Sequence, residues 1–235
     1  QANPQLPEDL MWAMHNIVDC AKLTVSLSSY YSYRRALPWM FSYVRSGGGD
    51  LRTSHNNTPV AELNCFTSDT LDYFFRNAVI GFCTGNYRVE PFGENAQESD
   101  TVPVAINKQF LIPGAMHYLD GHVLVLADVE KDGELRFLDS TTAASRDIYS
   151  FNGLNSVTGI PPKRSGRSGN EYAGCFQGLR IFRYPIAEVD ENGEVTKVRR
   201  RTDAEMREFG YSVEQYDKVE EIVTTQHIVE NGFTL

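Results

Sequence analysis

The stretch that decides the fold is His122-Val-Leu-Val-Leu-Ala-Asp-Val129, followed after a short gap by Leu135-Arg-Phe-Leu-Asp139. Its first part is an almost continuous apolar run, which is typical of a central strand covered on both faces. Asp132-Gly133 lies between the two parts, and this pair favours a two-residue hairpin turn. The sequence therefore predicts a buried antiparallel hairpin inside a sheet.

Helices and further strands are predicted around this hairpin. Residues 7–33 repeat apolar side chains at three- and four-residue steps, which predicts an N-terminal helix with one buried face. A second helix is expected just after Cys65, because Thr67 is a good N-cap residue and an apolar stripe follows it. The remaining expected elements are strands at 87–90 and 178–184, a hairpin around Asn192-Gly193, and an acidic helix capped by Asp203 that reaches about residue 223 and breaks near Gly210.

The bulk composition predicts one globular domain. The chain has 235 residues, of which 41% are hydrophobic and 23% charged, so it can bury a sizeable core without metal or disulfide support. We expect a single α+β domain over residues 1–235. Its expected parts are a helical part at 1–60, a part containing the central hairpin at 61–185, and a C-terminal hairpin and helix at 186–235.

The charge and the apolar runs limit the classes of partner. A formal net charge of −9 argues against a nucleic acid, because phosphate binding needs clustered Lys and Arg. No apolar run approaches the roughly 20 residues that a membrane span needs. The sequence begins at Gln1 rather than Met, and its glycosylation sequon Asn56-Asn57-Thr58 is a pattern too common to decide the compartment. The compartment stays open, with a mild lean towards an exported protein.

The cysteines leave two possibilities. The sequence has four, Cys20, Cys65, Cys83 and Cys175, with no CxxC pair, so zinc-ribbon spacing is absent. Four cysteines allow two disulfides in three connectivities, and they are equally compatible with reduced thiols.

One set of residues has the chemistry of a nucleophilic site. A helix N-terminus lowers the pKa of a thiol and offers backbone N–H groups to an oxyanion, and Cys65 is expected at such a position. His122, at the start of a rigid strand, can act as the base, and Asp139 on the returning strand can orient it. Asn64 is a candidate for a side-chain oxyanion donor.

The hairpin register tests this set. A two-residue turn at Asp132-Gly133 places Asp139 opposite Leu126, on the same face of the sheet as His122. Four residues then separate His122 from Leu126, which is about 13 Å along the strand. A contact between His122 and Asp139 therefore requires a turn displaced towards Lys131 or a bulge in the hairpin.

These residues resemble the catalytic core of transglutaminase-like proteins in the papain-like superfamily. The resemblance lies in Asn64-Cys65-Phe66 opening a helix, Gly121-His122 opening a strand, and Asp139-Ser140-Thr141 ending the next, and it covers about residues 60–142. It implies a papain-like fold, in which helices precede an antiparallel sheet and the nucleophile starts a helix packed on that sheet. It also implies a Cys65–His122–Asp139 triad.

The chain departs from the family pattern at three places, one of which is Val123, where an aromatic residue often follows the His. Ser140 stands where the family often has Pro, and no Gln precedes Cys65 at the place of the papain oxyanion donor. These departures put the oxyanion site in doubt and leave room for a scaffold that has lost activity.

We therefore predict a cysteine-dependent enzyme that acts on an amide bond of a peptide or protein, without a cofactor or metal. Water as the acceptor would make it a protease or amidase, and an amine would make it a transglutaminase-type acyltransferase. The alternative is an inactive papain-like fold that serves as a protein-interaction module. Two weaker alternatives are a metal site made by His117, Asp120 and His122, and His117 as the base in place of His122.

Overall fold

The computed structural model describes residues 19–48, 57–65, 77, 81–89, 96–119, 121–131, 133, 135–140, 146–151 and 178–215. These residues form short and long helices together with strands β1–β10, and every strand pair is antiparallel. The predicted α+β class is confirmed at this level. The predicted second helix lies outside the described residues, apart from the helical Asn77 and Gly81.

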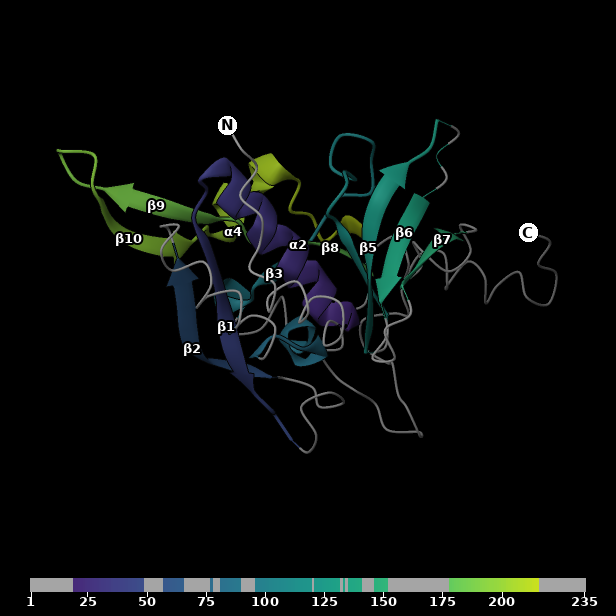
Figure 1. Ribbon diagram of the computed structural model, residues 1–235, viewed down its shortest axis with the longest axis horizontal. Helices are drawn as coiled ribbons and strands as arrows, with labels where there is room; N and C mark the ends of the chain where they lie inside the picture. Colours follow the sequence, from purple (N-terminus) through teal and green to yellow (C-terminus); the bar gives the residue numbers. More distant parts are fainter. Residues whose placement is uncertain are drawn as a thin grey trace.

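A six-stranded antiparallel sheet forms the centre of the molecule (Figure 1). Its spatial order is β3-β8-β4-β5-β6-β7, so the predicted central hairpin lies inside the sheet. The strands are β3 (Thr101–Pro103), β8 (Gly178–Phe182), β4 (Met116–Leu119), β5 (His122–Val129), β6 (Leu135–Ser140) and β7 (Arg146–Phe151).

The hairpin β5–β6 has the strands that the sequence predicts but a different register. Its pairing begins at Val129↔Leu135 and shifts between Leu126 and Asp128, so that one extra residue bulges from β5. The last pair is Val125↔Leu138, and extending this register places Asp139 opposite Leu124. The predicted pairing of Asp139 with Leu126 is therefore wrong, and the bulge moves Asp139 towards His122.

Helix α2 (Cys20–Arg35) packs against β5 and β6. Asp19 is its N-cap: it has extended backbone angles, and its side chain accepts a hydrogen bond from the N–H of Lys22. A continuous helix over residues 7–33 is therefore wrong, because Asp19 has extended angles and α2 begins after it; the part of that prediction before Asp19 lies outside the described residues. At the other end Ala36 adopts the left-handed conformation, with φ 51°, and closes the helix.

The sheet separates two apolar clusters, and successive strand residues such as Ile181 and Phe182 belong to different clusters. One cluster lies between the sheet and α2: Cys20, Ala21, Val25, Trp39, Phe41, Phe82, Tyr87, Met116, Tyr118, Val123 and Phe182. The other includes Met206 of the short helix α4 (Asp203–Met206): Val102, Val104, Leu111, Ala115, Leu126, Leu135, Phe137, Leu179, Ile181 and Met206.

The segment before β3 is irregular and is held by buried arginines. The expected strand at 87–90 is wrong, since Thr84–Arg88 forms the 3-10 helix η2 and Ala96–Glu98 forms η3. Arg180 donates to the carbonyls of Tyr87 and Thr101, at 2.9 and 3.3 Å. Arg183 donates to the carbonyls of Ser99 and Ala96, at 3.1 and 3.0 Å. These side chains satisfy carbonyls that a sheet ladder would otherwise satisfy.

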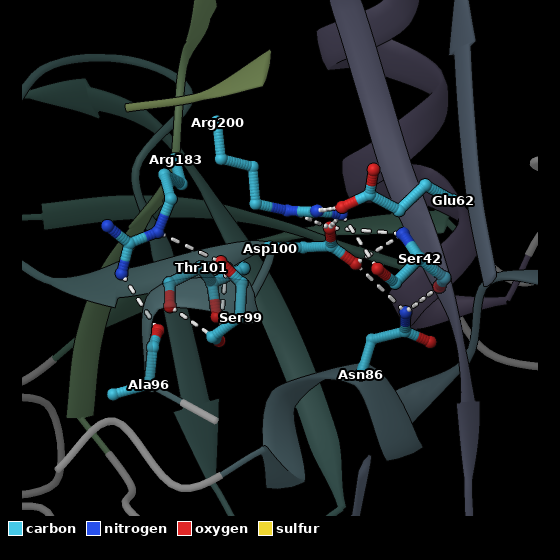
Figure 2. Close-up of polar contacts among 9 residues, drawn as sticks. All are labelled: Ser42, Glu62, Asn86, Ala96, Ser99, Asp100, Thr101, Arg183 and Arg200. Carbon is cyan, nitrogen blue, oxygen red and sulfur yellow. Dashed lines mark hydrogen bonds and ion pairs between the residues drawn. The ribbon is translucent and has the colours of Figure 1, made fainter. Parts of the chain in front are cut away.

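A third arginine, Arg200, completes what we call the arginine cluster (Arg180, Arg183 and Arg200). Figure 2 shows its guanidinium directed at the carboxylate of Asp100, with an Nη2–Oδ1 distance of 2.8 Å. Asp100 also accepts from the backbone N–H of Ser42 and from the side-chain amide of Asn86. The Asp100 side chain is only 2% exposed, so its charge is buried with a full set of donors.

Two smaller sheets flank the central one. The pair β1 (Trp39–Arg45) and β2 (Thr58–Cys65) follows α2, and β9 (Pro185–Val189) pairs with β10 (Val195–Arg200). The second pair confirms the hairpin predicted around Asn192-Gly193, with Gly193 at φ 83° in the turn. After it, α4 and the 3-10 helix η5 (Arg207–Phe209) end at Gly210, where the helix break was predicted. Thr202 rather than Asp203 is the N-cap of α4, and the predicted continuation beyond residue 215 lies outside the described residues.

Candidate active site at the fork of β5 and β6

His122 and Asp139 are in contact. The Nε2 atom of His122 lies 2.8 Å from Oδ1 of Asp139, and the two side chains are 42% and 11% exposed. The carboxylate thereby orients the ring and leaves its Nδ1 side for another partner. Two register changes make this contact possible. The ladder starts at Val129↔Leu135, which shifts Asp139 by one residue towards His122 relative to a two-residue turn at Asp132-Gly133, and the bulge in β5 shifts it by one more.

The ladder between β5 and β6 stops beside this pair. The last described backbone pair is Val125↔Leu138, so β5 and β6 separate towards His122 and Asp139; we call this opening the fork. Leu126 donates its backbone N–H to the carbonyl of Ala115, on the β4 side. Because N–H directions alternate along a strand, the N–H of Val123 points towards β6, into the fork.

The side chain next to this N–H is that of Cys20. The backbone N–H of Val123 is hydrogen-bonded to the Cys20 sulfur, and the Asp139 charge acts on the same thiol. In Figure 1 the N-terminal end of α2 lies beside the end of the sheet where β5 begins and β6 ends. The thiol thus accepts from an N–H group that would pair with β6 if the ladder continued.

Cys20 is also the first residue of a helix of 16 residues, which gives it further donors. The N–H groups of the first helical turn have no carbonyl partner within the helix, and the helix dipole is positive there. The N–H of Ala21 is hydrogen-bonded to the Cys20 sulfur. The sulfur of Cys20 therefore lies between a helix N-terminus and a strand N–H.

Burial opposes ionisation of this thiol. Cys20 is 9% exposed, and this desolvation raises the thiol pKa, outweighing the lowering by the N–H of Val123. The negative charges of Asp19 and Asp139 raise the pKa further, and the N–H of Ala21 lowers it. In this geometry the thiol is protonated at neutral pH, so its activation needs transfer of the proton to a base.

Cys65, the predicted nucleophile, lies elsewhere. It is the last residue of β2, and its backbone pairs with Trp39 in the separate β1–β2 sheet. Trp39 follows the C-terminal end of α2, a helix of 16 residues and about 24 Å that begins at Cys20. Figure 1 shows the arrowhead of β2 and the start of β5 on opposite sides of the molecule. Asn64, the predicted oxyanion donor, pairs with Met40 in the same sheet, and the side chains of both predicted residues lie outside the described part.

His117 does not join the site. It pairs with Leu124 from β4, is fully buried, and burial lowers its pKa to about 4. Its ring lies 6.1 Å from that of Phe137. Asp120 lies outside the described residues, and within the described ones no three His, Cys, Asp or Glu side chains are grouped as a metal site requires.

The sequence reasoning missed Cys20 because the apolar spacing of residues 7–33 runs across it. The available signal was Asp19, one of the preferred N-cap residues, directly before it. Cys20 and Cys83 are both free thiols. Because two of the four cysteines are free, two disulfides are excluded. Cys175 and the side chain of Cys65 lie outside the described residues, so a single bond between them stays open.

No protein-family model matches the chain, and no curated protein or solved structure is similar to it. Among the helices that the structure describes, none combines the length and apolar character that crossing a membrane would require.

Proposed function

We propose that this chain is a cysteine-dependent enzyme that attacks an amide carbonyl, with Cys20, His122 and Asp139 as its reacting group. The observation that carries the proposal is the hydrogen bond from the N–H of Val123 to the Cys20 sulfur, next to the His122–Asp139 contact of 2.8 Å. The resemblance predicts a papain-like arrangement of a thiol at a helix start, a histidine at a strand start and a carboxylate on the next strand. In the proposed site Cys20 takes the role that was expected for Cys65.

The chemistry follows from the donors around the thiol. His122 takes the proton of Cys20, and the thiolate forms a bond to the substrate carbonyl carbon. The backbone N–H of Cys20 itself is suited to hold the oxyanion, whereas the N–H groups of Lys22 and Leu23 are already bound to Asp19. The C–N bond then breaks as His122 protonates the leaving amine, and an acceptor attacks the thioester with His122 as base.

The acceptor decides the reaction class. Water gives a protease or amidase, and a primary amine gives transglutaminase-type transfer. The substrate class is the amide bond of a peptide or protein in both cases. The proposed residues supply every proton transfer themselves, so the mechanism calls for no cofactor.

One observation favours the second candidate, an inactive scaffold used for protein binding. The thiol of Cys20 is 9% exposed, and its pKa is raised chiefly by burial. A thiol in that state is a weak nucleophile unless a base activates it. Reactivity therefore separates the two candidates.

The test is iodoacetamide labelling across pH, with mass spectrometry of each cysteine peptide, on the wild type and on His122→Ala. We expect Cys20 to react faster than Cys83 in the wild type and to lose about tenfold or more of its rate in His122→Ala. Cys20→Ser and Cys65→Ser form the matched pair of variants for activity on a casein or peptide-library substrate. Loss of activity in Cys20→Ser alone supports the proposed site.

Three other outcomes contradict it. Labelling of Cys20 that is slow and indifferent to His122 would favour the binding scaffold. Activity lost in Cys65→Ser and kept in Cys20→Ser would restore the nucleophile predicted from the sequence. Activity kept in both variants would exclude Cys20 and Cys65 alike as the nucleophile.

A further inference from the structure

Asp19 and Lys22 form an ion pair at the N-terminus of α2. Lys22 donates its backbone N–H to Oδ1 of Asp19, and its Nζ lies 2.9 Å from Oδ2 of the same carboxylate. The two side chains are 18% and 20% exposed, so solvent screens the pair only partly. Both oxygens of Asp19 are therefore occupied by one residue, Lys22.

The charges of this pair act on two thiols. Asp19 directly precedes Cys20, and its charge acts on the Cys20 sulfur. Cys83, in the turn before η2, is also within the electrostatic reach of both Asp19 and Lys22. Cys20 belongs to α2 and Cys83 does not. A change in reactivity that both thiols show must therefore come from charge rather than from a change in the structure of the first turn of α2.

Capping alone does not require a charge. Asn, Ser and Asp are similarly good N-cap residues, so a neutral side chain would hold the helix start equally well. A carboxylate at this position adds a negative charge beside a thiol that must ionise to react, which is unfavourable unless a cation neutralises it. Lys22 is placed to do so.

We propose that the Asp19–Lys22 ion pair is a positioning device that sets the reactivity of Cys20. The carboxylate fixes the first turn of α2, and the ammonium of Lys22 offsets the charge that this cap places beside the sulfur. The inference rests on the proposed role of Cys20 as the nucleophile. Neither residue touches the reacting atoms; both act through the thiol.

The other titratable groups around the thiol are the same in every variant. They are His122 on β5, Asp139 on β6, and Cys83 and Tyr87 on the segment around η2. Tyr87 is fully buried and hydrogen-bonded to Thr24 at 2.6 Å, and its pKa is raised far above the range of the experiment, so it stays protonated.

The experiment measures iodoacetamide labelling of Cys20 and Cys83 between pH 6 and 9.5 in three variants. Asp19→Asn keeps the cap and removes the charge, so we expect Cys20 to react roughly threefold faster at pH 7.5. Lys22→Met leaves Asp19 unneutralised, and Cys20 should react roughly threefold more slowly. The double variant should return close to the wild type, and Cys83, on which both charges act, should move in the same directions.

Asp19→Ala serves as the control for helix capping, because it removes the cap and the charge together. Circular dichroism and the urea midpoint identify any loss of structure. Equal rate–pH profiles for the wild type, Asp19→Asn and Lys22→Met would overturn the inference, even if Cys20 labelling depends on His122. Cys20 labelling that ignores His122 but follows these charges would instead overturn the proposed function alone.

Discussion

The fork and the arginine cluster both bury charged or polar groups, but they satisfy them differently. At Asp100 one carboxylate receives donors from Ser42, Asn86 and Arg200. At the fork the backbone ladder has ended, and the Val123 N–H meets a thiol while Asp139 meets a histidine that is 42% exposed. The first region is closed to solvent and the second is partly open to it.

This difference suggests that the arginine cluster contributes mainly to stability and the fork mainly to reactivity. Removing one partner of a buried carboxylate that has a full set of donors strongly destabilises the protein, because the other charge stays buried without compensation. Groups at the end of a ladder contribute less to stability and are available to a substrate. We therefore expect substitutions at the arginine cluster to act on unfolding, and substitutions at the fork to act on the thiol.

The largest effect is expected for Arg200→Met, which leaves Asp100 buried without its cation. We expect a loss of about 3–5 kcal/mol in the free energy of unfolding, measured by urea denaturation at pH 7. Arg199→Met is the matched control, because the neighbouring Arg199 binds Glu188 and Glu205 at the surface and should have a much smaller effect. Equal losses in the two variants would contradict the contrast.

The second prediction uses the buried histidine of the same sheet. The pKa of His117 is lowered to about 4, so its native state binds fewer protons than the unfolded state between that value and about 6.5. Its contribution to stability is therefore present above pH 6.5 and is lost as the pH falls towards 4. Between pH 7 and 4.5 we expect His117→Gln to lose about 2 kcal/mol less than the wild type in urea unfolding. An identical pH dependence in the two proteins would show that protonation of His117 does not reduce the free energy of unfolding.

The third prediction concerns the fork itself. Asp139→Asn should change the free energy of unfolding by about 1 kcal/mol or less, because solvent screens its half-exposed partner His122. The Asp139 charge is the smallest of the five influences on the Cys20 pKa, so loss of ring orientation should dominate. Iodoacetamide labelling of Cys20 should then slow several-fold. A faster reaction would mean that the carboxylate acts on the thiol mainly by its charge.

The smallest effect is expected at the far end of α2. Ala36 has φ 51°, a conformation that glycine adopts without strain. Ala36→Gly should stabilise the protein by about 0.5 kcal/mol, after the added entropy of the unfolded chain is subtracted. Thermal unfolding measures the gain, and Cys20 labelling should stay unchanged. A change in that labelling would show that strain at this end of α2 reaches the thiol.

Local patterns predicted much of this fold. The apolar run 122–129 and the Asn192-Gly193 pair correctly predicted β5–β6 and β9–β10, because strand and turn preferences depend on nearby residues. The two-residue turn predicted at Asp132-Gly133 was wrong, since the ladder begins at Val129↔Leu135. The strand expected at 87–90 failed because tertiary contacts override local propensity there: Tyr87 enters the core and Arg180 binds its carbonyl.

The sequence by itself determined the antiparallel hairpin and the candidate roles of His122 and Asp139. Only the tertiary structure decided which cysteine lies beside them. A displaced turn and a bulge in β5 brought the carboxylate to the imidazole, and packing of α2 on β5 placed Cys20 at the fork. That packing joins segments about 100 residues apart in the sequence, and no local pattern encodes it.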